Sequence, residues 1–132
     1  MVKALFDTNI LIDYLNAIPE ARVEFERYDD RAISVITWME VMVGAGEAVQ
    51  AATRAFLDGF KTVELHADIA ERAVAFRRTR KIKLPDAIIW ASATVEARLL
   101  VTRNTKDFPS DSPGIRVPYV VTRVVAGPGG VA

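Results

Sequence analysis

Apolar residues alternate along the chain between short continuous runs and longer stretches in which every third or fourth residue is apolar. The short runs predict buried strands at about residues 2–6, 32–35, 62–65, 99–102 and 114–117. The helical spacing predicts helices at about residues 10–15, 19–28, 37–45, 47–60, 67–80 and 85–97, the last of them apolar on nearly every side and therefore buried. Strands alternating with helices indicate an α/β fold with a central, mainly parallel sheet of four to five strands covered on both faces.

Length and composition indicate one domain. The chain has 132 residues, 51% of them hydrophobic, so it can bury a core without disulfides or structural metals. We expect a single domain over residues 1–119. We expect residues 120–132, which include the glycine-rich stretch 126–130, to form a C-terminal extension or flexible tail without an assigned role.

The residue inventory restricts the chemistry. Seventeen basic and seventeen acidic residues give a net charge of zero, which argues against a uniformly positive surface that wraps nucleic acid. The lack of cysteine excludes thiol catalysis and cysteine zinc sites, and the single histidine, His66, excludes a histidine-rich metal site. Catalysis must use carboxylates, hydroxyls, amides and cations, which favour a hard metal ion such as Mg²⁺ or Mn²⁺.

Targeting signals are not evident in the sequence. No apolar run approaches the ~20 residues that span a bilayer. Asp7 interrupts the only segment near the N-terminus that resembles a signal-peptide core. We therefore expect a cytoplasmic protein that does not associate with membranes.

Four acids lie at boundaries between predicted elements: Asp7, Glu40, Asp86 and Asp107. Each has a structural explanation. Asp7 suits a helix N-cap, and Glu40 stands three residues after Thr37, the spacing of a capping box. Asp86 falls in the first turn of a predicted helix, where negative charge is favourable, and Asp107 suits a turn.

Taken together, these acids support a second interpretation. A parallel sheet would gather three of them at the carboxyl ends of its strands, where α/β proteins form their sites. Carboxylates packed together repel one another, so the cluster is expected to hold a cation such as Mg²⁺ or Mn²⁺. Such a site suits phosphoryl chemistry, with Glu40 or Asp86 orienting the attacking water.

A basic run precedes Asp86. It places five cations within seven residues at the end of a predicted helix: Arg77, Arg78, Arg80, Lys81 and Lys83. Cations at a helix C-terminus complement the helix dipole and stay solvated, which is the structural explanation. The alternative is that they bind RNA, because they concentrate positive charge beside the acidic cluster.

Four stretches, in this order, resemble the PIN-domain ribonucleases and, within them, the VapC-type toxins of prokaryotic toxin-antitoxin pairs. They are Phe6–Leu11, Ser34–Glu40, Leu84–Ile89 and Val101–Phe108. The resemblance covers about residues 2–119. It implies a three-layer α/β/α sandwich, endonucleolytic RNA cleavage that depends on Mg²⁺ or Mn²⁺, a homodimer, and neutralisation by a small VapB-like antitoxin.

The resemblance also implies a set of site residues. Asp7, Glu40 and Asp86 correspond to the acidic metal site of the family. Asn104 stands where many members carry Asp, and Asp107 follows three residues later, so either residue can complete the site. Asn104 can ligate through its carbonyl oxygen but brings no charge, which disfavours a second metal ion. Hydrogen bonds to the site are expected from three further residues: Thr8, Asn9 and Thr102.

Two other classes of function remain as alternatives to a metal-dependent ribonuclease. Phosphoryl transfer through an aspartyl intermediate would require a second acid beside or two residues beyond Asp7, and Thr8 and Asn9 do not supply one. A non-catalytic PIN-like module that binds RNA or a protein would use the acids as helix caps alone. Stabilisation of the fold by Mn²⁺ distinguishes a shared metal site from isolated caps, and a phosphate-analogue adduct on Asp7 would support the aspartyl intermediate.

Overall fold

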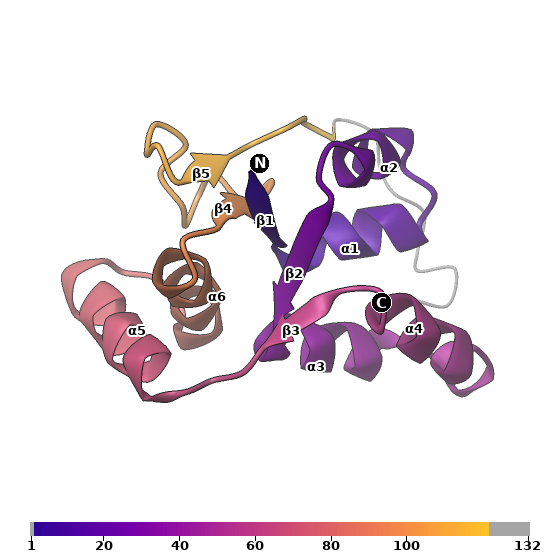
Figure 1. Ribbon diagram of the computed structural model, residues 1–132, viewed down its shortest axis with the longest axis horizontal. Helices are drawn as coiled ribbons and strands as arrows, with labels where there is room; N and C mark the ends of the chain where they lie inside the picture. The colour runs from indigo at the N-terminus through magenta and orange to yellow at the C-terminus, as the bar shows by residue number, and fades with distance from the viewer. Residues whose placement is uncertain (1, 122–132) are drawn as a thin grey trace.

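The computed structural model describes residues 2–121 of the chain (Figure 1). The strands are β1 (Lys3–Phe6), β2 (Asp30–Ser34), β3 (Lys61–Val63), β4 (Leu99–Val101) and β5 (Ile115–Arg116). The helices are α1 (Thr8–Leu15), α2 (Pro19–Glu26), α3 (Val35–Gly44), the short 3-10 helix η1 (Glu47–Val49), α4 (Gln50–Leu57), α5 (Ala67–Thr79) and α6 (Leu84–Val95). Five strands alternating with helices confirm the predicted α/β fold.

All five strands are parallel and form one sheet in the order β3-β2-β1-β4-β5. The central strand β1 pairs with β2 on one side and with β4 on the other. Leu5 of β1 lies opposite Ala32 of β2 and Leu100 of β4. The carboxyl ends of β1, β2 and β4 therefore meet at one edge of the sheet.

Helices cover both faces of the sheet, so the predicted three-layer arrangement is confirmed. In Figure 1, α5 and α6 lie on one side of the strands and α1 to α4 lie on the other. Leu5 faces α6 and belongs to the first hydrophobic cluster, whereas Ala4 and Phe6 face the second cluster beside α1 and α2. Leu5 and Phe6 are fully buried, and truncating a buried side chain of this size typically costs about 2–5 kcal/mol.

Helix α6 is the buried helix that the sequence predicts. All seven residues from 87 to 93 are buried. Pro85 lies in the first turn, where its missing amide hydrogen is not needed for a helical hydrogen bond. Trp90 stacks on Phe76 of α5 with ring centroids 4.3 Å apart, which fixes α5 against α6.

The helices predicted at 37–45 and 47–60 differ from those of the structure. Helix α3 begins at Val35 and not at Thr37, because the Ser34 hydroxyl accepts a hydrogen bond of 3.1 Å from Ile36 N and caps the helix. Glu40 therefore lies in the second turn and is not part of a capping box. The helix predicted at 47–60 is divided into η1 and α4, because Val49 leaves the helical region with φ −114° and ψ 4°.

None of the helices in residues 2–121 combines the length and apolar composition needed to cross a membrane. The predicted extension at 120–132 lies, from residue 122 onward, outside the described residues. The boundary at residue 119 stays a prediction.

Candidate active site

The site lies at the carboxyl ends of the neighbouring strands β1 and β4, from which the chain continues toward opposite sides of the sheet, to β2 and to β5. Asp7 follows β1, Thr102 follows β4, and Ser34 ends β2. The Asp7 amide donates to the Val101 carbonyl over 2.9 Å, which holds the ends of β1 and β4 side by side. Ligand-binding crevices of open α/β sheets form at this kind of switch point.

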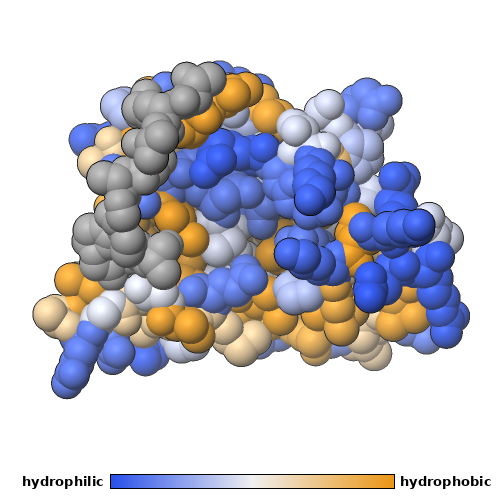
Figure 2. Space-filling model, turned by 180° about the vertical axis from the view of Figure 1, so that it is seen from behind, coloured by the Kyte–Doolittle hydropathy of each residue, from blue (hydrophilic) through white to orange (hydrophobic). Residues whose placement is uncertain are grey.

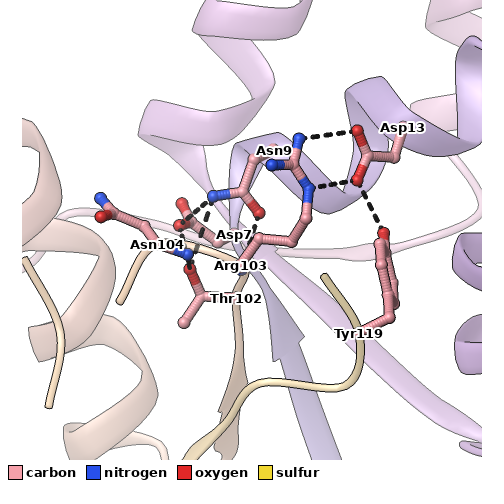
Figure 3. Close-up of polar contacts among 7 residues, drawn as sticks. All are labelled: Asp7, Asn9, Asp13, Thr102, Arg103, Asn104 and Tyr119. Carbon is pink, nitrogen blue, oxygen red and sulfur yellow. Dashed lines mark hydrogen bonds and ion pairs between the residues drawn. The ribbon is translucent and has the colours of Figure 1, made fainter. Parts of the chain in front are cut away.

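Asp7 is buried at the centre of the site. It is 3% exposed and caps α1, with its Oδ1 accepting a 2.8 Å hydrogen bond from Thr8 N. Its Oδ2 accepts from Thr102 Oγ1 at 2.7 Å and from Asn9 Nδ2 at 3.0 Å (Figure 3). The carboxylate therefore caps a helix, and three donors in all, including the capping Thr8 amide, fix its orientation.

The pKa of Asp7 shows how this carboxylate is surrounded. Burial raises its pKa from 3.8 to about 6, and the nearby carboxylates of Asp86 and Glu40 add to the increase. The hydrogen bonds from Thr102 and Thr8 oppose the increase without cancelling it. The negative charge of Asp7 is therefore incompletely compensated by the protein.

Glu40 reaches the site from α3. Its Oε1 accepts a 2.6 Å hydrogen bond from Thr8 Oγ1, so the residue after Asp7 orients this second acid. The hydroxyls of Thr8 and the buried Thr37 are 3.0 Å apart. Thr37 thus contacts Thr8 in the site and does not cap a helix, a role that sequence spacing did not indicate.

Asp86 comes from the first turn of α6, as predicted. Its pKa is raised by partial burial first and then by the carboxylates of Asp107 and Glu40, while Lys83 lowers it. Asp86 and Glu40 both act on Asp7 as well. The structure therefore brings the four predicted acids into one electrostatically coupled group.

The loop after β4 forms the remaining corner. Asn104 Nδ2 donates to Asp107 Oδ2 at 2.9 Å, and Asp107 N donates back to Asn104 Oδ1 at 3.1 Å. Asn104 N donates to Thr102 Oγ1 at 2.9 Å. Both candidates for the fourth position are thus held together, with Asp107 near Asp86.

The donor set fits a hard divalent cation. It consists of carboxylate and amide oxygens, and burial, followed by the neighbouring carboxylates, raises the pKa values of Asp7 and Asp86. Within residues 2–121, no three acidic or histidine side chains are already grouped as ligands of one ion. Mg²⁺ usually takes one or two carboxylates and keeps several waters, so it does not require such a group.

A second polar cluster lies beside the site and was missed by sequence reasoning. Asp13 of α1 is buried and pairs with Arg103, and Tyr119 donates to the same carboxylate (Figure 3). The available signal was a lone acid within the apolar helix segment 10–15, four residues after Asn9.

The predicted RNA-binding run divides into two groups. Arg77 donates a 2.6 Å hydrogen bond to the Ile82 carbonyl, and the Arg80 guanidinium lies 4.9 Å from the centroid of the Trp90 ring. These two cations have structural contacts within the chain. All five residues of the run are exposed, and the second group consists of Arg78, Lys81 and Lys83.

An apolar surface lies on the same helix as Glu40. Met39 and Val43 of α3 are 44% and 86% exposed. Figure 2 shows apolar residues along the lower edge of the molecule, the edge at which α3 lies in Figure 1. Exposed apolar residues that gather beside a site are typical of a surface that binds another protein.

Comparisons with known proteins agree with this geometry. The PIN domain model matches residues 4–110. A chain of a toxin-antitoxin complex from Klebsiella pneumoniae is 50% identical, with a TM-score of 0.85 over 90% of this chain and 100% of that one. A chain of DNA-bound VapBC from Salmonella typhimurium is 26% identical, with a TM-score of 0.72 over 88% and 96% of the two chains. A comparison with curated proteins found no match.

A more distant structure shares the fold alone. A chain of FitAcB from Neisseria gonorrhoeae is 18% identical, with a TM-score of 0.74 over 87% of this chain and 97% of that one. Taken with the closer matches, the fold and the acidic edge of the sheet define a PIN domain, and the chain belongs to the PIN-domain family. The resemblance to VapC-type toxins inferred from the four sequence stretches is confirmed.

Proposed function

We propose that the chain is a metal-dependent endoribonuclease toxin. The observation that carries the proposal is the convergence of Asp7, Glu40, Asp86 and Asp107, two of which have raised pKa values. A buried, uncompensated carboxylate destabilises a fold, so a site that keeps one is a candidate for function. RNA as the substrate rests on membership of the PIN family.

Asp7, Glu40 and Asp86 would hold Mg²⁺ or Mn²⁺, with Asn104 or Asp107 as the fourth position. When bound, the ion supplies Lewis acidity for ionising water and for the charge that develops on the phosphate. Thr102 and Asn9 orient Asp7, and Thr8 orients Glu40. These neutral donors fix the acids without neutralising them, which leaves their charge for the cation.

Exposed cations beside the acids would bind the substrate backbone. The charge of Lys83 already acts on Asp86, so this lysine is close enough to contact a phosphate near the site. Arg78 and Lys81 extend the exposed positive charge away from it. Arg77 and Arg80 contribute less, because they are engaged in contacts within the chain.

Two protein partners are part of the proposal. The neighbours from Klebsiella pneumoniae and Salmonella typhimurium belong to a toxin-antitoxin complex and to VapBC, which supports neutralisation of this chain by a small VapB-like antitoxin. The exposed Met39 and Val43 on α3 suit an apolar protein contact, either with the antitoxin or with a second copy in a homodimer. Co-purification of the chain with the product of a small adjacent reading frame tests the antitoxin.

The proposed activity is tested with purified protein and end-labelled RNA in the presence of Mg²⁺ or Mn²⁺. Asp7→Asn and Asp86→Asn should each abolish cleavage while the far-ultraviolet circular dichroism spectrum stays unchanged. Asp58→Asn is the matched control, because Asp58 is exposed and precedes β3 at the opposite edge of the sheet. Full cleavage by Asp7→Asn would refute the proposal, and so would wild-type protein that cleaves no RNA with either metal.

A further inference from the structure

The buried Asp13 carboxylate joins three separate segments of the chain. Arg103 binds it through two parallel hydrogen bonds, Nε to Oδ2 at 2.5 Å and Nη2 to Oδ1 at 2.8 Å. The Tyr119 hydroxyl donates to Oδ2 over 2.8 Å. The Asp13 carboxylate therefore links α1, the loop after β4 and the segment after β5 (Figure 3).

The same cluster is connected to the acidic site through the backbone of Arg103. Arg103 N donates to Asn9 Oδ1 over 3.2 Å, and the other end of that amide donates to Asp7 Oδ2. Arg103 also stands between Thr102 and Asn104, which contact Asp7 and Asp107 respectively. Movement of Arg103 would therefore displace several groups of the site together.

We infer that Asp13, Arg103 and Tyr119 are positioning residues that fix the loop after β4, and through it Asn9, Thr102 and Asn104, in the geometry the acidic site requires. The inference rests on the proposed nuclease function. It also gives a role to chain beyond the last strand, because Tyr119 follows β5. None of the three residues is expected to touch the substrate.

The need for Tyr119 follows from the burial of Asp13. Asp13 is 1% exposed, so its charge is stable only if the oxygens receive enough donors. Arg103 supplies one donor to each oxygen, and Tyr119 adds the second donor to Oδ2. Burial and the adjacent Asp13 carboxylate raise the pKa of Tyr119 well above its usual range, so this hydroxyl stays a donor.

The chain contains a matched control for this cluster. Glu24 is also buried, and Arg116 binds it through Nε at 2.6 Å and Nη2 at 3.0 Å. The Tyr28 hydroxyl donates to Glu24 Oε2 over 2.8 Å, the same length as the Tyr119 bond. Arg116 meets Thr102 only through the β4–β5 backbone ladder, a contact that Tyr28→Phe leaves in place.

The test compares Tyr119→Phe with Tyr28→Phe. Both variants keep the ring and lose one hydroxyl, so both should lose a similar few degrees of melting temperature. Tyr119→Phe should in addition lower kcat for RNA cleavage on the order of tenfold, with KM within about twofold, because partners that orient site groups commonly have effects of this size. Tyr28→Phe should leave kcat unchanged. Equal kcat in the two variants would overturn the inference.

A second measurement is independent of catalysis. Nitrogen-15 NMR should show that Tyr119→Phe shifts the Arg103 backbone amide and the Asn9 side-chain amide, whereas Tyr28→Phe leaves both in place. Unchanged signals in Tyr119→Phe would overturn the inference even if the protein cleaves no RNA. If Tyr119→Phe shifts the signals but the wild-type protein cleaves no RNA, the positioning role is retained and only the nuclease proposal is refuted.

Arg103→Lys separates positioning from simple charge balance. Lysine keeps the positive charge but cannot form the two parallel hydrogen bonds of the guanidinium. The variant should show the kcat loss of Tyr119→Phe or a larger one. Wild-type kcat in Arg103→Lys would mean that charge alone is sufficient, and would overturn the inference.

Discussion

Thr102 donates its hydroxyl hydrogen to Asp7 Oδ2 over 2.7 Å, across 95 positions of the chain. The same oxygen of Thr102 accepts from Asn104 N at 2.9 Å. One buried hydroxyl therefore connects the acid at the end of β1 with the loop that carries both candidates for the fourth position, Asn104 and Asp107. Its removal should affect both.

Thr102→Val keeps the shape of the side chain and removes the hydroxyl. Asp7 loses one donor and Asn104 N loses its acceptor, so we expect a loss of about 1–3 kcal/mol in the free energy of unfolding at pH 7. Urea denaturation measures it. Thr94→Val is the control, because the hydroxyl of the exposed Thr94 donates to the carbonyl of Trp90 in its own helix. A Thr102→Val protein as stable as this control would contradict the expectation.

Asp7 should make stability depend on pH in an unusual direction. Its pKa in the folded protein, about 6, lies above the ordinary 3.8, so the folded state binds the extra proton between these values. The free energy of unfolding of the wild type should therefore increase as the pH falls through 6 toward 4, because Asp7 takes up a proton. The destabilisation caused by its buried negative charge is complete above about pH 7. A difference of about two pKa units corresponds to about 3 kcal/mol.

Asp7→Asn removes this titration. The free energy of unfolding of the variant minus that of the wild type should fall by up to about 3 kcal/mol between pH 7 and pH 4. Chemical denaturation at several pH values in the presence of EDTA measures it. The exposed Asp58→Asn reports the general effect of removing an acid. A difference that does not change with pH would show that Asp7 does not titrate near 6.

The sequence predicted the parts of the fold that depend on local pattern. Unbroken apolar runs predicted the strands, and the continuous burial of residues 87–93 followed from a helix without a polar face. Asp7 was identifiable because an acid directly after a buried strand is unusual. The start of α3 was not, because Thr37 and Ser34 are both good caps and only packing selects Ser34.

Contacts between distant residues were beyond sequence reasoning. Asp13 and Arg103 are 90 positions apart, and neither belongs to a local motif that predicts the pairing. The basic run is exposed, as its clustered cations indicated, but its sequence did not show that Arg77 donates to the Ile82 carbonyl. Sequence pattern identified the acids of the site, and the family resemblance implied the neutral donors Thr8, Asn9 and Thr102, but neither indicated the cluster around Asp13.

The Glu24 cluster should be a major source of stability away from the site. Arg116→Met removes the two hydrogen bonds that Arg116 donates to the buried Glu24 and leaves that carboxylate with the longer, 3.7 Å ion pair to Arg27, so we expect a loss of about 3 kcal/mol in the free energy of unfolding. Arg22→Met is the control, because the Arg22–Glu26 ion pair is exposed and should contribute less than about 1 kcal/mol. Similar losses in the two variants would contradict this ranking.

Within the basic run, Arg77 should contribute to stability and Arg78 to RNA binding. Arg77→Ala removes the donor of the Ile82 carbonyl, so we expect a loss of about 1–2 kcal/mol in the free energy of unfolding. Arg78→Ala should leave stability within about 0.5 kcal/mol and raise KM for RNA. Thermal denaturation and cleavage kinetics on both variants measure this. A stability loss confined to Arg78→Ala would reverse the assignment.

Mn²⁺ should stabilise the fold through the acidic cluster, and the effect should depend on pH. A ligand that binds only the folded state at 100 times its Kd adds about 2.7 kcal/mol. Below the Asp7 pKa of about 6 protons compete with the metal, so the increase in melting temperature should be larger at pH 7.5 than at pH 5. Asp7→Asn should lose most of the increase at pH 7.5, and Asp58→Asn should retain it. An equal increase in all three proteins would mean that Mn²⁺ binds elsewhere, and no increase at millimolar Mn²⁺ would favour a non-catalytic module whose acids are helix caps.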